Sequence, residues 1–141
     1  GCDHVINYAT ENFAVRVREI TGGAGVPVVY DGVGAATFEG SLDSLAPRGM
    51  LVSFGNASGA VPPFQPGILS QKGSLFFTRP TLGHYTASRA ELLESAAAFF
   101  EVVANGKVKV EIGQRYALAD AAQAHRDLEA RLTSGSTILL P

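Results

Sequence analysis

Four short stretches of small and polar residues bring together groups that could bind a ligand. They contain glycines, small hydroxyl and amide side chains, one carboxylate and one guanidinium. Such groups can hold a polar or anionic ligand through hydrogen bonds and charge. Each stretch directly follows a short apolar run, which places it at the end of a predicted strand. The stretches are residues 8–10, 31–34, 54–58 and 78–80.

The elements that would position these stretches alternate along the chain. The apolar pattern predicts strands over residues 4–8, 26–31, 50–54 and 74–78. Between the first three lie two helices, one capped by Thr10 with Phe13, Val17 and Ile20 on one face. The other carries Phe38, Leu42 and Leu45 and is stopped by Pro47 and Gly49. This alternation is typical of an α/β fold with a parallel sheet, whose carboxyl edge gathers all four stretches around one polar cleft.

The C-terminal third of the sequence predicts two more helices. Ser88 and Glu91 form a capping box, and the helix they open ends before Gly106. Its predicted buried face consists of Leu92, Ala96, Phe99, Phe100 and Val103. After a short alternating segment at residues 107–113, an Ala-rich helix covers residues 120–132, and an apolar strand near residues 136–140 closes the chain.

A purely structural interpretation of the polar stretches stays open. Gly, Asn, Ser and Pro occur in any loop, although four such stretches at one edge favour a ligand. The segment GVGAAT, residues 32–37, follows a strand and opens a helix, as a dinucleotide-binding glycine motif does. It lacks the third glycine, and Asn56 stands where an acid would hold a ribose, so the motif alone assigns no nucleotide.

No side-chain constellation predicts acid–base, nucleophilic or metal chemistry. Glu39 and Asp43 fit the solvated side of their helix, while Asp31 either caps the next helix or anchors the loop after its strand. The three histidines lack metal-ligand spacing, and no G-x-S-x-G motif is present. We therefore predict no catalytic side chain and no metal site in this chain.

Composition excludes several classes of partner. A net charge of −2 without a Lys/Arg cluster gives no footprint for nucleic acid. No apolar run approaches the roughly 20 residues that span a bilayer, and we find no signal peptide. The lone Cys2 favours a reducing compartment, so we expect a cytoplasmic protein. Because Val5 and Ile6 already belong to a predicted strand, we also expect the chain to be a fragment.

Six segments taken in order resemble one family. They look like the NADPH-dependent quinone oxidoreductases of the zeta-crystallin type, the zinc-free branch of the medium-chain dehydrogenases. SFGNASG and KGSLFFTRP are the most specific of them. The segments are GCDHVINY at residues 1–8, VVYDGVG at 28–34, GMLVSFGNASG at 49–59, QKGSLFFTRPTL at 71–82, LADAAQAHRDLEAR at 118–131 and GSTILLP at 135–141.

The resemblance implies a cofactor, NADPH, and ten residues beside it. Tyr8 matches a tyrosine near the adenosine 2′-phosphate, and Val33 lies beside the adenine and ribose. Arg131 matches an arginine that reaches the cofactor. Two departures are Gly32 and Ala57, where relatives often carry serine. Along the nicotinamide ribose and carboxamide, the resemblance places Phe54, Gly55, Asn56, Ser58, Phe77, Thr78 and Arg79.

The resemblance also implies how the chain is organised. Residues 1–107 would form the C-terminal part of a Rossmann-type NADPH domain, with an incomplete parallel sheet and flanking helices. Residues 108–141 would form a helix–strand tail that returns to a substrate domain. The intact enzyme would transfer hydride from NADPH to a quinone, while this segment alone would be inactive. The alternative is a non-catalytic binding or assembly module that dimerises through its sheet edge; a homodimer is expected in either case.

Overall fold

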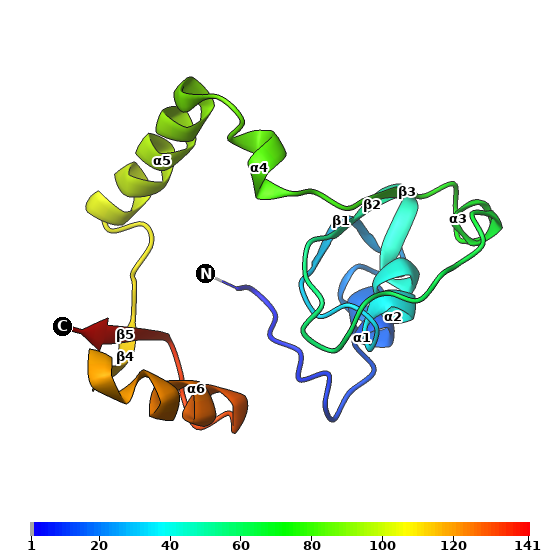
Figure 1. The fold of residues 1–141 in the computed structure, drawn as a ribbon. Coiled ribbons are helices and arrows are strands. Elements are labelled where there is room, and N and C mark those ends of the chain that lie inside the picture. Colours follow the sequence, from blue (N-terminus) through cyan, green and yellow to red (C-terminus); the bar gives the residue numbers. More distant parts are fainter. Residues whose placement is uncertain (1) are drawn as a thin grey trace. The chain divides into compact units, whose positions relative to one another are not determined.

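The computed structural model describes residues 2–141, which form two compact units. The first runs to His84 and the second covers Tyr85–Pro141, and each is described here by itself (Figure 1). The predicted division at residue 107 concerns an intact enzyme and stays a prediction. Within residues 2–141, no helix is long and apolar enough to cross a membrane.

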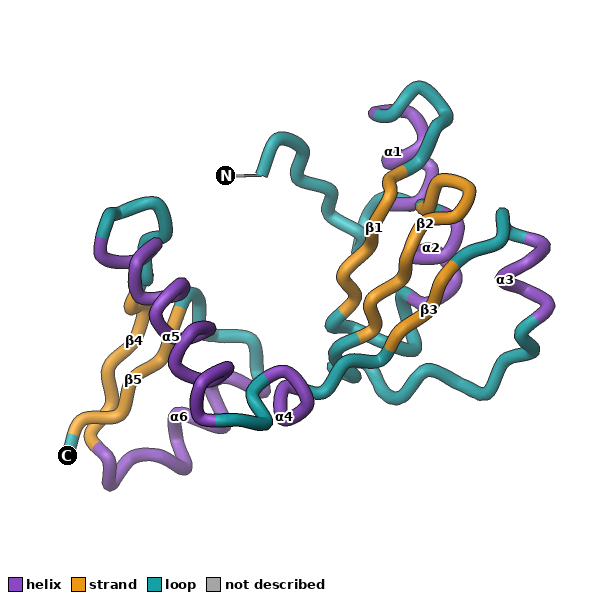
Figure 2. The backbone as a smooth tube through the Cα atoms, turned by 90° about the horizontal axis from the view of Figure 1, so that it is seen from above, coloured by secondary structure: helices purple, strands orange, loops and turns teal. Residues whose placement is uncertain are grey.

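The first unit is built on a parallel sheet. Its strands are β1 (Val26–Asp31), β2 (Leu45–Ser53) and β3 (Phe76–Thr78), in the order β1-β2-β3 (Figure 2). Val28 pairs with Met50, and Met50 pairs with Phe76. The predicted parallel α/β arrangement is confirmed, and the carboxyl ends of the three strands lie at one edge of the sheet.

The first unit also contains the helices α1 (Phe13–Ile20), α2 (Phe38–Asp43) and α3 (Gly67–Gln71), and helix α4 (Leu82–Tyr85) crosses its C-terminal boundary. Helix α2 packs on β1 and β2. Helix α1 begins at Asn12, whose side chain accepts a hydrogen bond from the Val15 N–H, so the predicted Thr10 cap is wrong. The Thr10 hydroxyl instead donates to the Asn7 carbonyl. Gly22 and Gly23, which follow α1, both have positive φ values, of 60° and 89°.

The hydrophobic core lies where α2 meets the sheet. It consists of Phe38, Leu42, Leu45, Leu51 and Leu75, each at most 7% exposed. Leu45 was expected on the helix but begins β2. Helix α2 ends at Asp43 because a helical Pro47 would clash with the carbonyl oxygen four residues earlier. The rings of Phe64 and Phe77 extend this core toward β3.

Residues 4–8 form no strand, so that prediction is wrong. They form bends and a turn in which Asn7 accepts hydrogen bonds from the backbone N–H groups of Ala9, Thr10 and Glu11. Val5 is 85% exposed. An apolar run becomes a strand only when another strand satisfies its backbone groups, and the described residues supply none to this segment.

The second unit contains a long helix and a βαβ element. Helix α5 (Arg89–Ala104) opens with the predicted capping box of Ser88 and Glu91. Strand β4 (Ile112–Ala117), a short 3₁₀ turn η1 (Leu118–Asp120), helix α6 (Ala121–Glu129) and strand β5 (Ser136–Leu140) follow. Strands β4 and β5 pair in parallel. Of the alternating segment 107–113, only Ile112 and Gly113 belong to β4, which continues to Ala117.

The predicted buried face of α5 is wrong for this chain. Leu92, Phe99 and Phe100 are 43%, 54% and 65% exposed, and no described side chain of α5 is buried. The apolar spacing of a helix predicts a face that can be buried. Whether it is buried depends on a packing partner, which the spacing does not specify.

Candidate functional site

The carboxylate of Asp31 organises the loop that follows β1. Asp31 is the last residue of β1 and only 5% exposed. Its Oδ1 accepts hydrogen bonds from the backbone N–H groups of Val33 (2.8 Å) and Gly34 (3.0 Å). Its Oδ2 accepts from the hydroxyls of Thr37 (2.8 Å) and Ser41 (2.7 Å). Of the two roles expected for Asp31, the structure therefore supports the loop anchor.

These hydrogen bonds determine the charge of Asp31. Burial alone would raise the pKa of this carboxyl group. The bonds from Gly34, Ser41, Thr37 and Val33 outweigh burial and hold the pKa below its ordinary value. The group is therefore an ionised carboxylate near neutral pH, stabilised by four uncharged hydrogen-bond donors, and no cation of residues 2–141 forms an ion pair with it.

The loops after β1 and β2 are joined to one another. The backbone N–H of Phe54 donates to the Asp31 carbonyl at 2.8 Å. The backbone N–H and the hydroxyl of Ser58 both donate to the Val33 carbonyl, each at 2.8 Å. The same hydroxyl accepts from the Ala36 N–H at 2.9 Å. Ser58, predicted to contact a cofactor, thus holds the β1 loop in this structure.

Glycines allow the two loops to approach closely. A Cβ atom at Gly55 would lie 2.3 Å from the Gly32 carbonyl oxygen, which is shorter than any real contact. A Cβ at Gly34, where φ is +92°, would lie 2.4 Å from the Gly59 oxygen. The ring of Phe54 lies over Gly32, so a Cβ at Gly32 would meet it at 3.0 Å. At Gly34 and Gly55 the neighbouring atoms are backbone oxygens, so these two positions need residues without side chains.

Two grooves open at this carboxyl edge, one beside β1 and one beside β3. The tyrosine groove, about 240 Å³ in volume, includes Tyr8 and Val33 among its lining residues. Its complete lining is Tyr8, Phe13, Val29, Tyr30, Asp31, Gly32, Val33, Thr37 and Ser41.

The arginine groove, about 460 Å³ in volume, lies beyond the β2 loop. Asn56, Phe77 and Arg79 line it together with Ser53 and residues 60–64. Arg79 is fixed there by Nη1, which donates to the Ser53 carbonyl at 2.7 Å. A guanidinium, an amide and an aromatic ring therefore face one open space.

The structure thus divides the predicted site residues among several places. Tyr8 and Val33 share the tyrosine groove, while Asn56, Phe77 and Arg79 share the arginine groove. Phe54, Gly55 and Ser58 belong to the loop after β2, and Thr78 ends β3. Arg131 lies in the second unit, directly after α6, with φ of 58°. Their roles toward a cofactor stay predictions.

Sequence analysis missed Thr37 and Ser41. Both are buried, at 7% and 3% exposure, and both donate to Asp31. A usable signal was present in their spacing. Hydroxyl residues six and ten positions after a strand-terminal acid lie one turn apart at the start of the next helix, and can face the same carboxylate.

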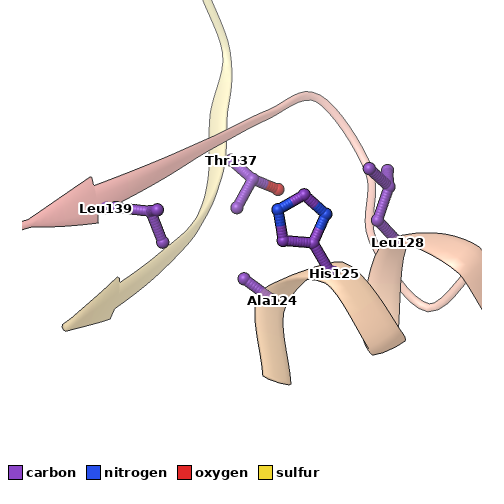
Figure 3. A pocket seen from close by; sticks show the side chains of 5 residues that line it. All are labelled: Ala124, His125, Leu128, Thr137 and Leu139. Carbon is purple, nitrogen blue, oxygen red and sulfur yellow. The ribbon is translucent and has the colours of Figure 1, made fainter. Parts of the chain in front are cut away.

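A separate small pocket lies in the second unit. Ala124, His125 and Leu128 on α6 face Thr137 and Leu139 on β5 (Figure 3). No predicted site residue lines this pocket. Within residues 2–141, no three His, Cys, Asp or Glu side chains gather as a metal site would require.

Comparison with known proteins identifies the relatives of this chain. A family model described as zinc-binding dehydrogenase matches residues 1–139. A quinone oxidoreductase of Pseudomonas aeruginosa is 55% identical over 141 residues, which cover all of this chain and 43% of the relative. A 2-haloacrylate reductase of a Burkholderia species is 46% identical over 142 residues, again covering all of this chain and 43% of the relative.

Solved structures give the same result. The Escherichia coli quinone oxidoreductase complexed with NADPH matches with a TM-score of 0.95 and 51% identity, covering 100% of this chain and 44% of that one. A mycobacterial protein complexed with NADPH matches with a TM-score of 0.93, 52% identity and the same two coverages. The chain therefore spans less than half the length of these relatives, and the resemblance to a C-terminal portion is confirmed.

Proposed function

Because the chain belongs to the zinc-binding dehydrogenase family, we propose that it supplies part of the NADPH-binding domain of an oxidoreductase that reduces a quinone. The observation that carries this proposal is the pair of joined loops at the carboxyl edge of a parallel sheet, the edge at which open α/β sheets bind ligands. Two relatives of the same fold, at 51% and 52% identity, were solved with NADPH.

Two grooves of this chain offer aromatic, amide and guanidinium groups of the kinds that could bind a nicotinamide dinucleotide. Close backbone approaches at Gly34 and Gly55 bring the two loops together at the carboxyl edge. The tyrosine groove offers the hydroxyl and ring of Tyr8 to the adenosine end. The arginine groove offers Asn56 and Arg79 to the polar nicotinamide end. NADPH, when bound, supplies the hydride, while these residues bind and orient it.

We propose no zinc-binding residue in this chain. The family description refers to zinc, but the described residues offer no set of three donors for it. No side chain of this chain is assigned a catalytic role either. We also propose a cytoplasmic location, because a single cysteine is typical of a reducing compartment.

A chimera tests the proposal. This chain would replace the matching 43% of the Pseudomonas aeruginosa quinone oxidoreductase, whose own sequence is the positive control. We expect the chimera to bind NADPH in a fluorescence titration and to oxidise it in the presence of 1,4-benzoquinone. 2-Haloacrylate would be tested as an alternative substrate, because a relative at 46% identity is a 2-haloacrylate reductase. A folded chimera that binds no NADPH would refute the proposal.

We further propose that the 141-residue chain by itself has no quinone reductase activity. The proposed cofactor contacts lie in the loops after β1 and β2, on β3 and just after it, and at Tyr8 and Arg131. The glycine-rich turn that holds the pyrophosphate in Rossmann folds is not among the described residues. Purified chain mixed with NADPH and benzoquinone should oxidise NADPH no faster than buffer does. Turnover at the rate of the chimera would disprove this.

The second candidate function, a module that dimerises through its sheet edge, is supported by the exposed edge strand β1. Strand β1 ends the sheet order, and its Val28 and Tyr30 are 39% and 74% exposed. Unpaired edge strands favour association between copies, so we propose a homodimer. Light scattering at several concentrations should detect it. Val28→Lys should shift the chain toward monomer, while Val5→Lys, at a site 85% exposed outside any strand, should not.

A further inference from the structure

Asp31 holds both loops of the carboxyl edge at once. Its side chain accepts from Val33 and Gly34 in the β1 loop. Its backbone carbonyl accepts from Phe54 at 2.8 Å and from Gly55 at 3.3 Å in the β2 loop. One residue therefore fixes the position of each loop relative to the strand end and to the other loop.

The carboxylate also occupies the backbone donors that could hold an anion. Successive N–H groups after a strand form a concave site that phosphates use in other proteins. Here the N–H groups of Val33 and Gly34 already donate to Asp31. An internal carboxylate thus takes the place of a ligand phosphate, which leaves this loop suited to neutral parts of a nucleotide.

We propose that Asp31 is a positioning residue for the cofactor. Its carboxylate, held by Thr37 and Ser41, fixes Val33 and Gly34 before NADPH binds, and its carbonyl fixes residues 54–55. This inference rests on the proposed function. Asp31 itself need not touch NADPH. Loops held in their binding arrangement lose less conformational freedom on binding, which strengthens affinity without a new contact.

Two buried serines allow a matched test in the chimera. Ser41→Ala removes the hydroxyl that donates to Asp31, whereas Ser44→Ala removes a hydroxyl that donates to the Gly40 carbonyl at 2.8 Å. Both serines are at most 3% exposed. We expect Ser41→Ala to raise the Kd and KM for NADPH about tenfold, the effect of losing one bond to a charged group, with kcat unchanged. Ser44→Ala should leave the Kd and KM unchanged.

Thr37 supplies the rescue experiment. Thr37→Val removes the hydroxyl and keeps the shape, and should weaken NADPH binding as Ser41→Ala does. Thr37→Ser restores the hydroxyl and should restore the affinity. Equal Kd values for Ser41→Ala, Thr37→Val and the unmodified chimera would overturn the proposal. So would an equal loss of affinity in Ser44→Ala, since that would reflect general destabilisation.

A readout independent of NADPH separates this inference from the proposed function. In the 141-residue chain, Ser41→Ala should speed hydrogen exchange at the Val33 and Gly34 amides, while Ser44→Ala should not. If the unmodified chimera binds no NADPH, the proposed function fails, whatever the exchange rates. If it binds NADPH and exchange at these two amides does not change in Ser41→Ala, the role of Asp31 fails alone.

Discussion

The hydroxyl of Ser41 donates a 2.7 Å hydrogen bond to the carboxylate of Asp31, which lies ten residues earlier in the chain. This bond connects the interior of α2 to the last residue of β1. The Ser41 hydroxyl is one of four uncharged groups that donate hydrogen bonds to this buried carboxylate. The stability of this unit should therefore depend on pH in a way that can be traced to one residue.

Asp31→Asn should destabilise the chain and remove part of its acid sensitivity. The folded-state pKa is lowered, so the stabilisation is present in full above the unfolded pKa of about 3.9 and is lost as pH falls through the folded value. At pH 7 we expect a loss of about 1–3 kcal/mol in the free energy of unfolding. Urea unfolding at several pH values measures this. The exposed Asp3→Asn is the control and should leave the free energy of unfolding at pH 7 unchanged.

Gly55→Ala should push the two loops apart. The new Cβ would lie 2.3 Å from the Gly32 oxygen, which is backbone and cannot rotate away. We expect a loss of about 1–3 kcal/mol in stability, as for other overpacked sites. Gly67→Ala in α3 is the control, since nothing lies within 4 Å of its Cβ position. Thermal unfolding would contradict the prediction if both variants melted at the temperature of the parent.

Tyr8→Phe in the chimera should weaken NADPH binding more than NADH binding. The ring would keep its edge contact with Phe13, whose centroid lies 6.4 Å away, while the hydroxyl is lost. Loss of one bond to a phosphate predicts about a tenfold rise in the NADPH Kd. Titrations with both nucleotides measure the difference. Tyr8→Ala should weaken binding further, and an unchanged NADPH Kd in both variants would exclude Tyr8 from the site.

Arg131→Gly in the chimera should separate cofactor binding from stability. Arg131 has φ of 58°, and its N–H donates to the Leu128 carbonyl at the end of α6. Glycine adopts this conformation without cost, which should stabilise the fold by about 1 kcal/mol. Loss of the guanidinium should nevertheless weaken NADPH binding, as Arg131→Ala should.

Arg48→Gly is the matched control for Arg131→Gly. Arg48 also has a positive φ, of 63°, but lies near the start of β2, away from the carboxyl edge. It should gain similar stability and keep its NADPH Kd. Unchanged affinity in both glycine variants would exclude Arg131 from the cofactor site.

Features with local causes could be predicted from the sequence. The Ser88–Glu91 capping box and strand β1 depend on a few neighbouring residues, and both are confirmed. The parallel direction of the strands follows from the alternation of strand and helix, because parallel strands need a crossover between them.

Features that depend on which segment packs against or pairs with another could not be predicted. Residues 4–8 and the apolar face of α5 have the composition of buried elements, but the structure leaves Val5 and Phe100 85% and 65% exposed. The site shows the same limit. The strand-end stretches were identified from their residue types, whereas the contribution of Thr37 and Ser41 required knowing that one helix turn faces Asp31.

Pairing between consecutive strands has a consequence for how the polypeptide assembles during synthesis. Strand β2 pairs with β1, β3 with β2, and β5 with β4. A ribosome releases the chain from its N-terminal end, so each strand emerges after the strand on which it docks. No strand in these sheets has to wait for a distant partner to be translated. The order of translation and the order of sheet growth can therefore coincide, which shortens the time that an unpaired edge is exposed to other nascent chains.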